Sequence, residues 1–294
     1  MNNKLIIAFP GNETLTNTIS RELEIPGGEI DVRHFPDGES YVRLVNDVNA
    51  KEVIVVATLH YPNDKFLPLL FLLQLLHDSG ARKITLVAPY LAYMRQDKQF
   101  KPGEAITSNY FSKLITPYID HLITVDPHLH RIHSMAELYA IPATVLHAAD
   151  LISDYVRHSI VSPVLIGPDS ESEQWVSAVA FRAQAPYLVL EKHRHGDRSV
   201  DISVPQVDRY RHHTPVLIDD IISTARTMIE TVEHLKIVGM KPPVCIGVHA
   251  VFSDQSFSDL VNAGPSKIVT CNTIPHPSNA IDLSSLIVET LRKS

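Results

Sequence analysis

The sequence lacks an excess of basic residues, which argues against a surface built for nucleic acid. Its 294 residues include 26 Lys and Arg against 33 Asp and Glu, so the formal net charge is −7. A protein that neutralises nucleic-acid phosphates needs clustered Lys and Arg in excess. The expected partners are therefore small molecules or further copies of this chain, and not nucleic acid.

Cysteine and long apolar runs are also scarce. Cys245 and Cys271 both lie in apolar β-like runs, where a thiol usually serves as a small apolar side chain and not as half of a disulfide. The most apolar stretch, residues 66–76, is too short to span a bilayer and contains Pro68 and Gln74. We expect a protein of the reducing cytoplasm, with no membrane segment.

What the sequence does contain is a regular alternation of β-branched runs and helical patterns. Apolar runs predict strands that begin near residues 5, 53, 84, 121, 164, 187, 216 and 245. Helical spacing predicts helices at 12–24, 64–77, 171–184 and 226–238. This alternation predicts an α/β fold with mainly parallel sheets that helices cover on both faces.

The chain is long enough for two modest cores, and two domains are the better expectation. The division is expected near residues 141–149, a stretch with Pro and Ala between two βα series. We therefore expect an N-terminal domain at 1–145 and a C-terminal domain at 146–294, whose last helix could pack back on the first. The halves could be related domains, although no convincing sequence repeat links them.

The most informative segment runs from Val216 to Thr227. It reads as an apolar strand, the acidic pair Asp219 and Asp220, a hydroxyl-rich turn and then a helix. Open α/β sheets bind ligands at the carboxyl ends of their strands, and a helix N-terminus with hydroxyls suits an anion such as a sugar phosphate. Paired carboxylates can accept from two ribose hydroxyls or hold magnesium through water. The alternative is a strand followed by an ordinary Ser/Thr helix cap.

This segment resembles the phosphoribosyl-binding loop of phosphoribosyltransferases and their relatives. Other segments resemble motifs of ribose-phosphate diphosphokinases in the expected order, namely residues 35–39 (FPDGE), 89–97 (PYLAYMRQD), 125–128 (VDPH), 167–169 (GPD), 192–194 (KHR), 251–253 (VFS) and 273–275 (TIP). The chain is identified as a short, divergent member of that family. The resemblance implies two phosphoribosyltransferase-like α/β domains, each with a mainly parallel sheet flanked by helices. It also implies transfer of pyrophosphate from MgATP to the 1-hydroxyl of ribose 5-phosphate, with Mg²⁺ as cofactor, giving phosphoribosyl pyrophosphate and AMP.

The resemblance further implies an ATP site in the N-terminal domain. Phe35, Asp37 and Glu39 would reach the adenine from a neighbouring subunit, which requires a homodimer or a larger homo-oligomer with shared ATP sites. An aromatic ring can stack on a base, and carboxylates can accept from its amino group. Arg95, Gln96 and Asp97 would make further ATP contacts. Without the resemblance, Pro-Asp-Gly predicts only a turn between two strands.

By the same resemblance, His128 and Asp169 would meet the magnesium–ATP complex, and His128 would also be catalytic. Asp169 ends a strand, where an oxygen ligand for a hard cation belongs. Taken alone, both residues could equally serve as helix caps or surface groups. His130 and His133 lie close to His128 in sequence, but the chain has 16 histidines, so chance clusters are common and we predict no zinc site.

Lys192 and Arg194 match the family's catalytic basic pair on a mobile loop. Phosphoryl transfer needs alignment and positive charge where negative charge builds up. The alternative is a solvated charged loop over residues 191–198. Residues 98–104, which include Pro and Gly, predict a second flexible loop that closes over the nucleotide.

The ribose 5-phosphate would be held by the acidic pair and the turn after it. The implied residues are Asp219, Asp220, Ser223, Thr224, Ala225, Arg226 and Thr227. The family's turn commonly reads Asp-Thr-Gly-Gly-Thr, so this chain lacks two glycines there, and this limits backbone approach and positive φ. Arg226 adds a cation that could compensate.

Two other functions remain open from the sequence. A phosphoribosyltransferase shares the sugar-phosphate loop but needs no second nucleotide site, so the motifs at 95–97 and 192–194 favour the diphosphokinase. A catalytically inactive relative with a regulatory role would usually have lost its basic or acidic catalytic residues, and those residues are present here.

Overall fold

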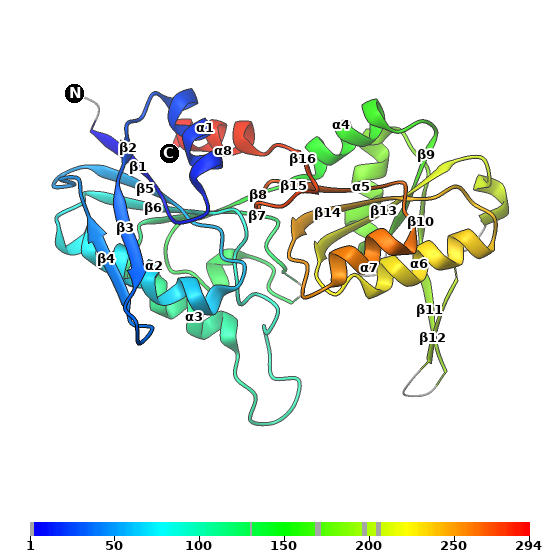
Figure 1. Ribbon diagram of the computed structural model, residues 1–294, viewed down its shortest axis with the longest axis horizontal. Coiled ribbons are helices and arrows are strands. Elements are labelled where there is room, and N and C mark those ends of the chain that lie inside the picture. Colours follow the sequence, from blue (N-terminus) through cyan, green and yellow to red (C-terminus); the bar gives the residue numbers. More distant parts are fainter. Residues whose placement is uncertain (1–2, 130, 168–171, 196–198, 204–206) are drawn as a thin grey trace. The chain divides into compact units, whose positions relative to one another are not determined.

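A computed structural model describes residues 3–129, 131–167, 172–195, 199–203 and 207–294 (Figure 1). The chain divides into two compact units. Unit 1 comprises Met1–Leu146, Thr273–Pro275 and Ser284–Ser294, and unit 2 comprises His147–Asn272 and His276–Leu283.

Unit 1 is built on a six-stranded parallel sheet. In spatial order its strands are β2 (Gly27–Gly28), β1 (Lys4–Ala8), β5 (Glu52–Val56), β6 (Lys83–Ala88), β7 (His121–Val125) and β8 (Ala143–Leu146). One face is covered by α1 (Glu13–Leu23) and α8 (Ser284–Lys293), and the other by α2 (Pro62–Asp78) and α3 (Thr107–Ile115) (Figure 1). The antiparallel hairpin β3 (Ile30–His34) and β4 (Ser40–Leu44) follows β2, and short 3₁₀ turns lie at η1 (Thr116–Tyr118) and η2 (Met135–Glu137).

Unit 2 has a second six-stranded parallel sheet. In spatial order its strands are β10 (Tyr187–Val189), β9 (Pro163–Gly167), β13 (Thr214–Ile222), β14 (Val244–Ala250), β15 (Lys267–Cys271) and β16 (Asn279–Ile281). Helices α4 (Ala149–Ser159) and α5 (Glu173–Ala183) cover one face, and α6 (Arg226–Ile237) and α7 (Ser256–Ala263) cover the other (Figure 1). The antiparallel hairpin β11 (Glu191–His195) and β12 (Ser199–Ser203) follows β10, and η4 (Val207–Tyr210) precedes β13.

The two units share one topology. Numbered along the chain within each unit, the parallel strands of both sheets lie in the order 2-1-3-4-5-6, and both units insert an antiparallel hairpin after the second strand. The prediction of two α/β domains with mainly parallel, helix-flanked sheets is confirmed. In such sheets the strand order reverses at one point, here between β1 and β5 and between β9 and β13, and ligands bind where the carboxyl ends diverge.

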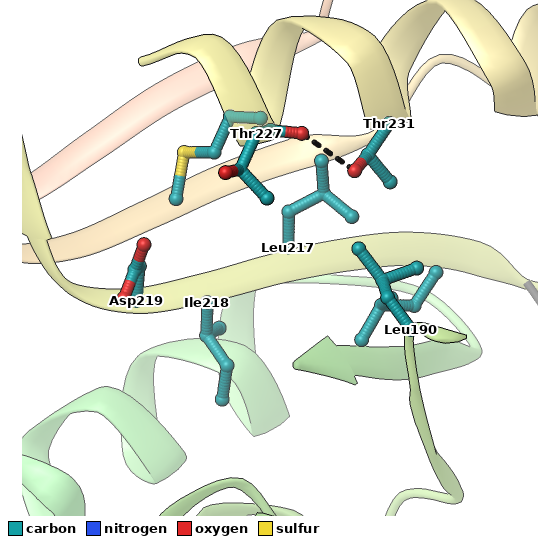
Figure 2. Close-up of a pocket in the computed structure, with 8 residues that line it drawn as sticks. Leu190, Leu217, Ile218, Asp219, Thr227 and Thr231 are labelled. Atoms are coloured by element: carbon teal, nitrogen blue, oxygen red, sulfur yellow. Dashed lines mark hydrogen bonds between the residues drawn. The ribbon is translucent and has the colours of Figure 1, made fainter. Parts of the chain in front are cut away.

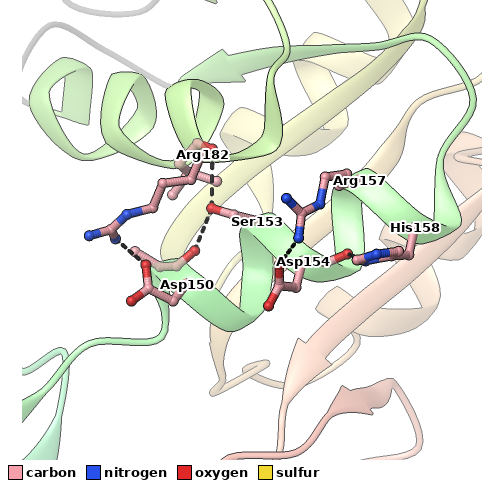
Figure 3. A network of polar contacts seen from close by, with 8 residues as sticks. Asp150, Ser153, Asp154, Arg157, His158 and Arg182 are labelled. Carbon is pink, nitrogen blue, oxygen red and sulfur yellow. Dashed lines mark hydrogen bonds and ion pairs between the residues drawn. The ribbon is translucent and has the colours of Figure 1, made fainter.

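Polar contacts tie α4 to α5 on one face of the second sheet (Figure 3). The Ser153 hydroxyl donates to the Ala149 carbonyl at 2.6 Å and also lies 3.1 Å from the Val179 carbonyl of α5. Arg182 of α5 forms an ion pair with Asp150 of α4. Because Ser153 is buried, its bonds to backbone carbonyls remove the cost of a polar group between two packed helices.

The two cysteines are free and buried, in β14 and β15. Burial raises the pKa of the Cys245 thiol to about 12, so this side chain stays neutral and packs as an apolar group. The prediction that both thiols serve as small apolar side chains therefore agrees with their positions. Among the described helices, none is long and apolar enough to cross a membrane.

Two segments differ from the secondary structure expected of them. The stretch at 141–149, expected as a link, contains the edge strand β8, whose Ala143 pairs with Leu122 of β7. The charged run at 191–198, expected as a loop, begins with β11, in which Lys192 pairs with Ile202 of β12. Both strands are stabilised by pairing with a partner strand, a tertiary contact that local composition does not reveal.

In unit 1, buried hydrogen bonds fill the point where the strand order reverses. Asn12, which follows β1 and is 3% exposed, accepts from the Thr58 N–H at 2.9 Å and donates to the Phe9 carbonyl at 3.0 Å. The Thr58 hydroxyl donates to the carbonyl of Thr273 at 2.5 Å, in the segment Thr273–Pro275 that joins unit 1 from far along the chain. Protein groups thus occupy the crevice between β1 and β5, and a ligand of unit 1 is expected at the ends of β6 and β7 instead.

Asn12→Ala is expected to lower the unfolding free energy of unit 1 by about 1–3 kcal/mol, because it leaves the buried Thr58 N–H without its acceptor. Hydrogen exchange of the peptide that contains Thr58 should accelerate. The matched control is Asn17→Ala, on the exposed side of α1, which should change stability by no more than about 0.5 kcal/mol. Equal exchange rates in the parent and Asn12→Ala would show that the amide bridge does not hold the crevice closed.

Candidate functional site

The acidic pair lies in the carboxyl half of β13, and the strand continues past it through Ile221 and Ile222, two residues beyond the expected end. Asp219 pairs in register with Gly247 of β14, and its Oδ1 accepts from the Asp220 N–H at 2.9 Å. Both aspartates are partly exposed. Asp219 and Thr227 line the same pocket, so the strand end and the start of α6 approach each other there (Figure 2).

That pocket is too small for a sugar phosphate. Apart from Asp219 and the threonines of α6 its lining is apolar, with Leu190, Leu217 and Ile218 among its walls (Figure 2). It has room for roughly one water molecule. A sugar phosphate would therefore bind on the exposed side of the β13–α6 turn and not inside this pocket.

The turn after β13 is held in place by the β14–α7 loop. The Phe252 N–H donates to the Ile222 carbonyl at 2.8 Å, and the Ser253 N–H donates to the Ser223 carbonyl at 3.1 Å. The Ser256 hydroxyl donates to the same Ser223 carbonyl at 2.7 Å. Backbone hydrogen bonds from the Val-Phe-Ser motif therefore hold the candidate sugar-phosphate turn in position.

Ala225 occupies a backbone conformation that glycine usually takes. Its φ of 55° and ψ of 7° are left-handed, and it stands at the N-cap of α6 with only 7% of its surface exposed. A methyl side chain cannot accept from the first N–H groups of the helix, which leaves them for an anion. Ser223 and Thr227 are partly exposed around this position, and Thr224 and Arg226 are exposed.

In unit 1, the Arg-Gln-Asp motif follows a firmly anchored turn after β6. Leu91, Ala92 and Met94 are each at most 3% exposed, and the Tyr93 hydroxyl donates to Asn63 Oδ1 at 2.6 Å. Burial raises the pKa of Tyr93, which keeps that hydroxyl protonated as a donor. Arg95 comes directly after this anchor and is exposed.

Asp97 does not present an open carboxylate. Its side chain is 3% exposed, and its Oδ1 lies 3.2 Å from Nη1 of Arg131, in the segment that follows β7. The neighbouring Gln96 accepts at its carbonyl from the Ser108 N–H, which fixes the backbone of the motif to the start of α3. Arg131 was not singled out by the sequence, because a lone arginine after a strand carries no pattern.

The motif at 35–39 forms the turn of the β3–β4 hairpin. The Phe35 N–H donates to the Glu39 carbonyl at 2.8 Å, and the Glu39 N–H donates to Asp37 Oδ1 at 3.3 Å. Phe35 is 41% exposed and Asp37 and Glu39 are exposed, so all three are accessible on this chain. Arg33 lies over the ring of Tyr41 at 4.1 Å and stiffens the base of the turn.

The structure describes some of the other predicted site residues and not others. His128 is partly exposed shortly after β7. Asp169 lies outside the described residues, as does His130. Lys192 and Arg194 stand two positions apart on β11, paired with Ile202 and Val200 of β12. Among the described residues no group of three or more His, Cys, Asp or Glu side chains could hold a metal ion.

The structure adds a partly buried basic pair that the sequence did not reveal. Lys65, at the start of α2, approaches Nδ1 of His60 at 3.0 Å and donates to the Thr58 carbonyl at 3.2 Å. Desolvation lowers the pKa of Lys65 to about 8, and burial beside Lys65 lowers that of His60 to about 4. Near neutral pH the lysine is therefore mostly charged and the histidine neutral, at the carboxyl end of β5.

Two parallel sheets of one shared topology, with an acidic strand end and a hydroxyl-rich turn at a helix start, define a protein with phosphoribosyltransferase-type domains. Residues 5–118 match the N-terminal domain of ribose phosphate pyrophosphokinase, and residues 134–286 match the phosphoribosyl transferase domain. The chain belongs to the ribose-phosphate pyrophosphokinase family. The family predicted from the motifs is confirmed, and so is the prediction that the chain is an enzyme of that family.

Relatives match over nearly their whole length. A ribose-phosphate pyrophosphokinase of Sulfolobus acidocaldarius is 32% identical over 297 residues, which cover 98% of this chain and 99% of the relative. A ribose-phosphate pyrophosphokinase of Sulfurisphaera tokodaii is 30% identical, and the match covers 96% of this chain and 98% of the relative. The crystal structure of phosphoribosylpyrophosphate synthetase from Mycobacterium smegmatis superposes with a TM-score of 0.86 at 24% identity, covering 99% of this chain and 98% of that one, and confirms the fold.

Ala225→Gly is expected to leave the unfolding free energy of unit 2 nearly unchanged. Relief of the left-handed conformation, worth about 1–2 kcal/mol, offsets the lost methyl burial and the extra freedom of the unfolded chain. Ala148→Gly is the matched control, because Ala148 is a fully buried N-cap residue of α4 with φ of −76°. The Ala148→Gly change should lower the unfolding free energy of unit 2 by about 1–2 kcal/mol.

The single tryptophan, Trp175 in α5, reports unfolding of unit 2 by its fluorescence. Equal losses in the two glycine variants would show that Ala225 stores no backbone strain.

Proposed function

We propose that this chain transfers the pyrophosphoryl group of ATP to the 1-hydroxyl of ribose 5-phosphate. The hydroxyl oxygen attacks the β-phosphorus, the bond from that phosphorus to the oxygen bridging to the α-phosphate breaks, and AMP leaves as the hydroxyl proton is lost. The products are phosphoribosyl pyrophosphate and AMP. Family membership over nearly the whole chain supports the reaction class.

The observation that carries the proposal is the turn between β13 and α6. Asp219 and Asp220 stand near the carboxyl end of β13, beside the point where the strand order reverses, which is where a doubly wound sheet binds its ligand. Their carboxylates would accept from the ribose hydroxyls, and the open N–H groups of α6 would receive the 5-phosphate. The turn Ser223 to Thr227 would add hydroxyl donors, and Arg226 would add a cation.

ATP would bind at the ends of β6 and β7 in unit 1. Arg95 and Gln96 would hold its phosphates, and Phe35, Asp37 and Glu39 of another copy would hold its adenine. The exposed 35–39 turn supports this division, because its groups are accessible to a second chain. We propose a homodimer or larger homo-oligomer with shared sites, located in a reducing cytoplasm that suits the two free thiols.

Mg²⁺ fits the donor set of the chain. Mg²⁺ is usually bound through one or two carboxylates together with substrate phosphates and water, so a cage of protein ligands is not required. Asp219 and Asp220 offer such carboxylates, and His128 and Asp169 would meet the nucleotide's metal complex. The ion would neutralise charge on the triphosphate, while Lys192 and Arg194 of the hairpin would stabilise the charge that develops on the transferred group.

The test is to incubate the protein with ATP, Mg²⁺ and ribose 5-phosphate and to follow AMP and phosphoribosyl pyrophosphate together. Equal amounts of the two products are expected. Release of ADP, or of phosphate without AMP, would contradict pyrophosphoryl transfer. Consumption of added phosphoribosyl pyrophosphate with a free base would instead favour a phosphoribosyltransferase.

Asp219→Ala and Asp220→Ala are expected to weaken ribose 5-phosphate binding roughly 10- to 100-fold, because each removes a charged acceptor for a sugar hydroxyl. ATP binding should change by less than about threefold, since these residues hold the sugar. Calorimetry with each ligand separately measures both. Asp259→Ala, on the exposed side of α7, is the matched control and should bind both ligands as the parent does. Equal losses for the sugar and for ATP would defeat the assignment.

Asp37→Ala and Lys192→Ala are each expected to abolish activity alone, and a mixed dimer of the two should regain it. If Asp37 of one chain completes the site that holds Lys192 of its partner, one of the two sites collects both lesions and the other has none. Differently tagged chains allow the mixed dimer to be purified before assay. A purified mixed dimer as inactive as either parent variant would show that both residues act within one chain.

A further inference from the structure

The segment after β6 holds an aromatic ring close to two cations. Phe100 is 55% exposed, with Lys98 Nζ 5.3 Å from the centre of its ring and the Arg131 guanidinium 5.4 Å away. The backbone of this segment is braced from below, since Glu104 Oε2 accepts from the N–H groups of Phe100 and Lys101 at 2.9 and 3.0 Å. Arg131 therefore contacts a turn that has internal hydrogen bonds.

The ion pair of Asp97 and Arg131 is strongly asymmetric in burial. The Asp97 side chain is 3% exposed and that of Arg131 is 46% exposed. A buried carboxylate is costly unless it is paired, so Asp97 is the fixed member of the pair and Arg131 is the member that faces outward. One guanidinium nitrogen, Nη1, makes both contacts to Asp97, at 3.2 and 3.5 Å.

The outward face of Arg131 keeps donors to spare. A guanidinium has five N–H groups, and within the described part of the chain Nε and Nη2 of Arg131 make no hydrogen bond. Arg131 follows β7 and Asp97 follows β6, so the pair lies at the carboxyl edge of two adjacent parallel strands. Arg95, Lys98 and Lys101 are exposed at the same edge, which makes it a basic surface suited to phosphates.

We propose that Arg131 is an additional phosphate-binding residue of the ATP site, and that Asp97 is a positioning residue that acts through it. The inference rests on the proposed function and deepens it, because it replaces a direct ATP contact of Asp97 by an indirect one. The carboxylate and the Phe100 ring hold the guanidinium in one orientation before ATP arrives. A preorganised, planar cation of this kind binds phosphate oxygens in pairs.

The test is calorimetry of MgATP binding to the full chain, without ribose 5-phosphate. Arg131→Ala should raise the Kd for MgATP roughly 10- to 100-fold, since a charge-assisted contact is lost, and Arg131→Lys should recover part of it. Asp97→Ala and the isosteric Asp97→Asn should raise the Kd by less than Arg131→Ala does. The double variant Asp97→Ala, Arg131→Ala should bind no more weakly than Arg131→Ala alone. In turnover, the KM for ATP should rise while the KM for ribose 5-phosphate stays constant.

Arg82→Ala is the matched control. Arg82 pairs with Glu52 at 2.5 Å, and both residues lie at the opposite, amino edge of the same sheet. Removing that ion pair should leave MgATP binding unchanged, so the effect at Arg131 is not a general effect of breaking an ion pair.

Two outcomes would overturn this inference and leave the proposed function standing. One is a parent and an Arg131→Ala variant that bind MgATP equally well. The other is a further loss on adding Asp97→Ala to Arg131→Ala, which would mean that Asp97 meets the nucleotide itself. A parent that binds no MgATP would sink the proposed function and this inference with it.

Discussion

The hydrogen bonds of Asn12 across the ends of β1 and β5 decide where unit 1 can bind a ligand. In a doubly wound sheet the ends of these two strands form the natural crevice. Asn12, Thr58 and the returning carbonyl of Thr273 fill it with mutually satisfied polar groups, all of them buried. The predicted ligand residues of unit 1 then lie at the next strand ends, at Arg95 after β6 and His128 after β7.

The same topology carries a different chemistry in unit 2. The strand equivalent to β5 is β13, which carries two carboxylates just before its last two residues. It is followed by a turn with a left-handed alanine and by a helix without a side-chain cap. The same strand order therefore carries a set of structural hydrogen bonds in unit 1 and a candidate sugar-phosphate site in unit 2. The two hairpins are equivalent as well: β3–β4 carries the Phe35 turn, and β11–β12 carries Lys192 and Arg194.

The parallel strands and the main helices were predictable because they are apolar and periodic. β1, β5, β6, β7 and β14 are β-branched runs, and α1, α2, α5 and α6 begin within two residues of their expected starts. The shared topology was not predictable, since backbone pairing leaves no repeated side-chain pattern between the halves. β2 consists of two glycines, and β11 is a run of charged residues and histidine, so neither has the composition of a strand.

The candidate site was predictable in its motifs but not in its contacts. The order of acids, hydroxyls and helix marks the turn at 219–227 from local sequence alone. The burial of Asp97 against Arg131 depends on the pairing of β6 with β7, which brings two segments 34 residues apart to one edge. The positive φ of Ala225 could likewise not be predicted from the residue type, because alanine has no preference for it.

The most direct test of this account is a crystal structure of the chain grown with ribose 5-phosphate. We expect the sugar at Asp219 and Asp220, its phosphate at the start of α6, and Asn12 still hydrogen-bonded to Thr58 in unit 1. A sugar phosphate bound between β1 and β5, with the Asn12 bridge broken, would contradict it.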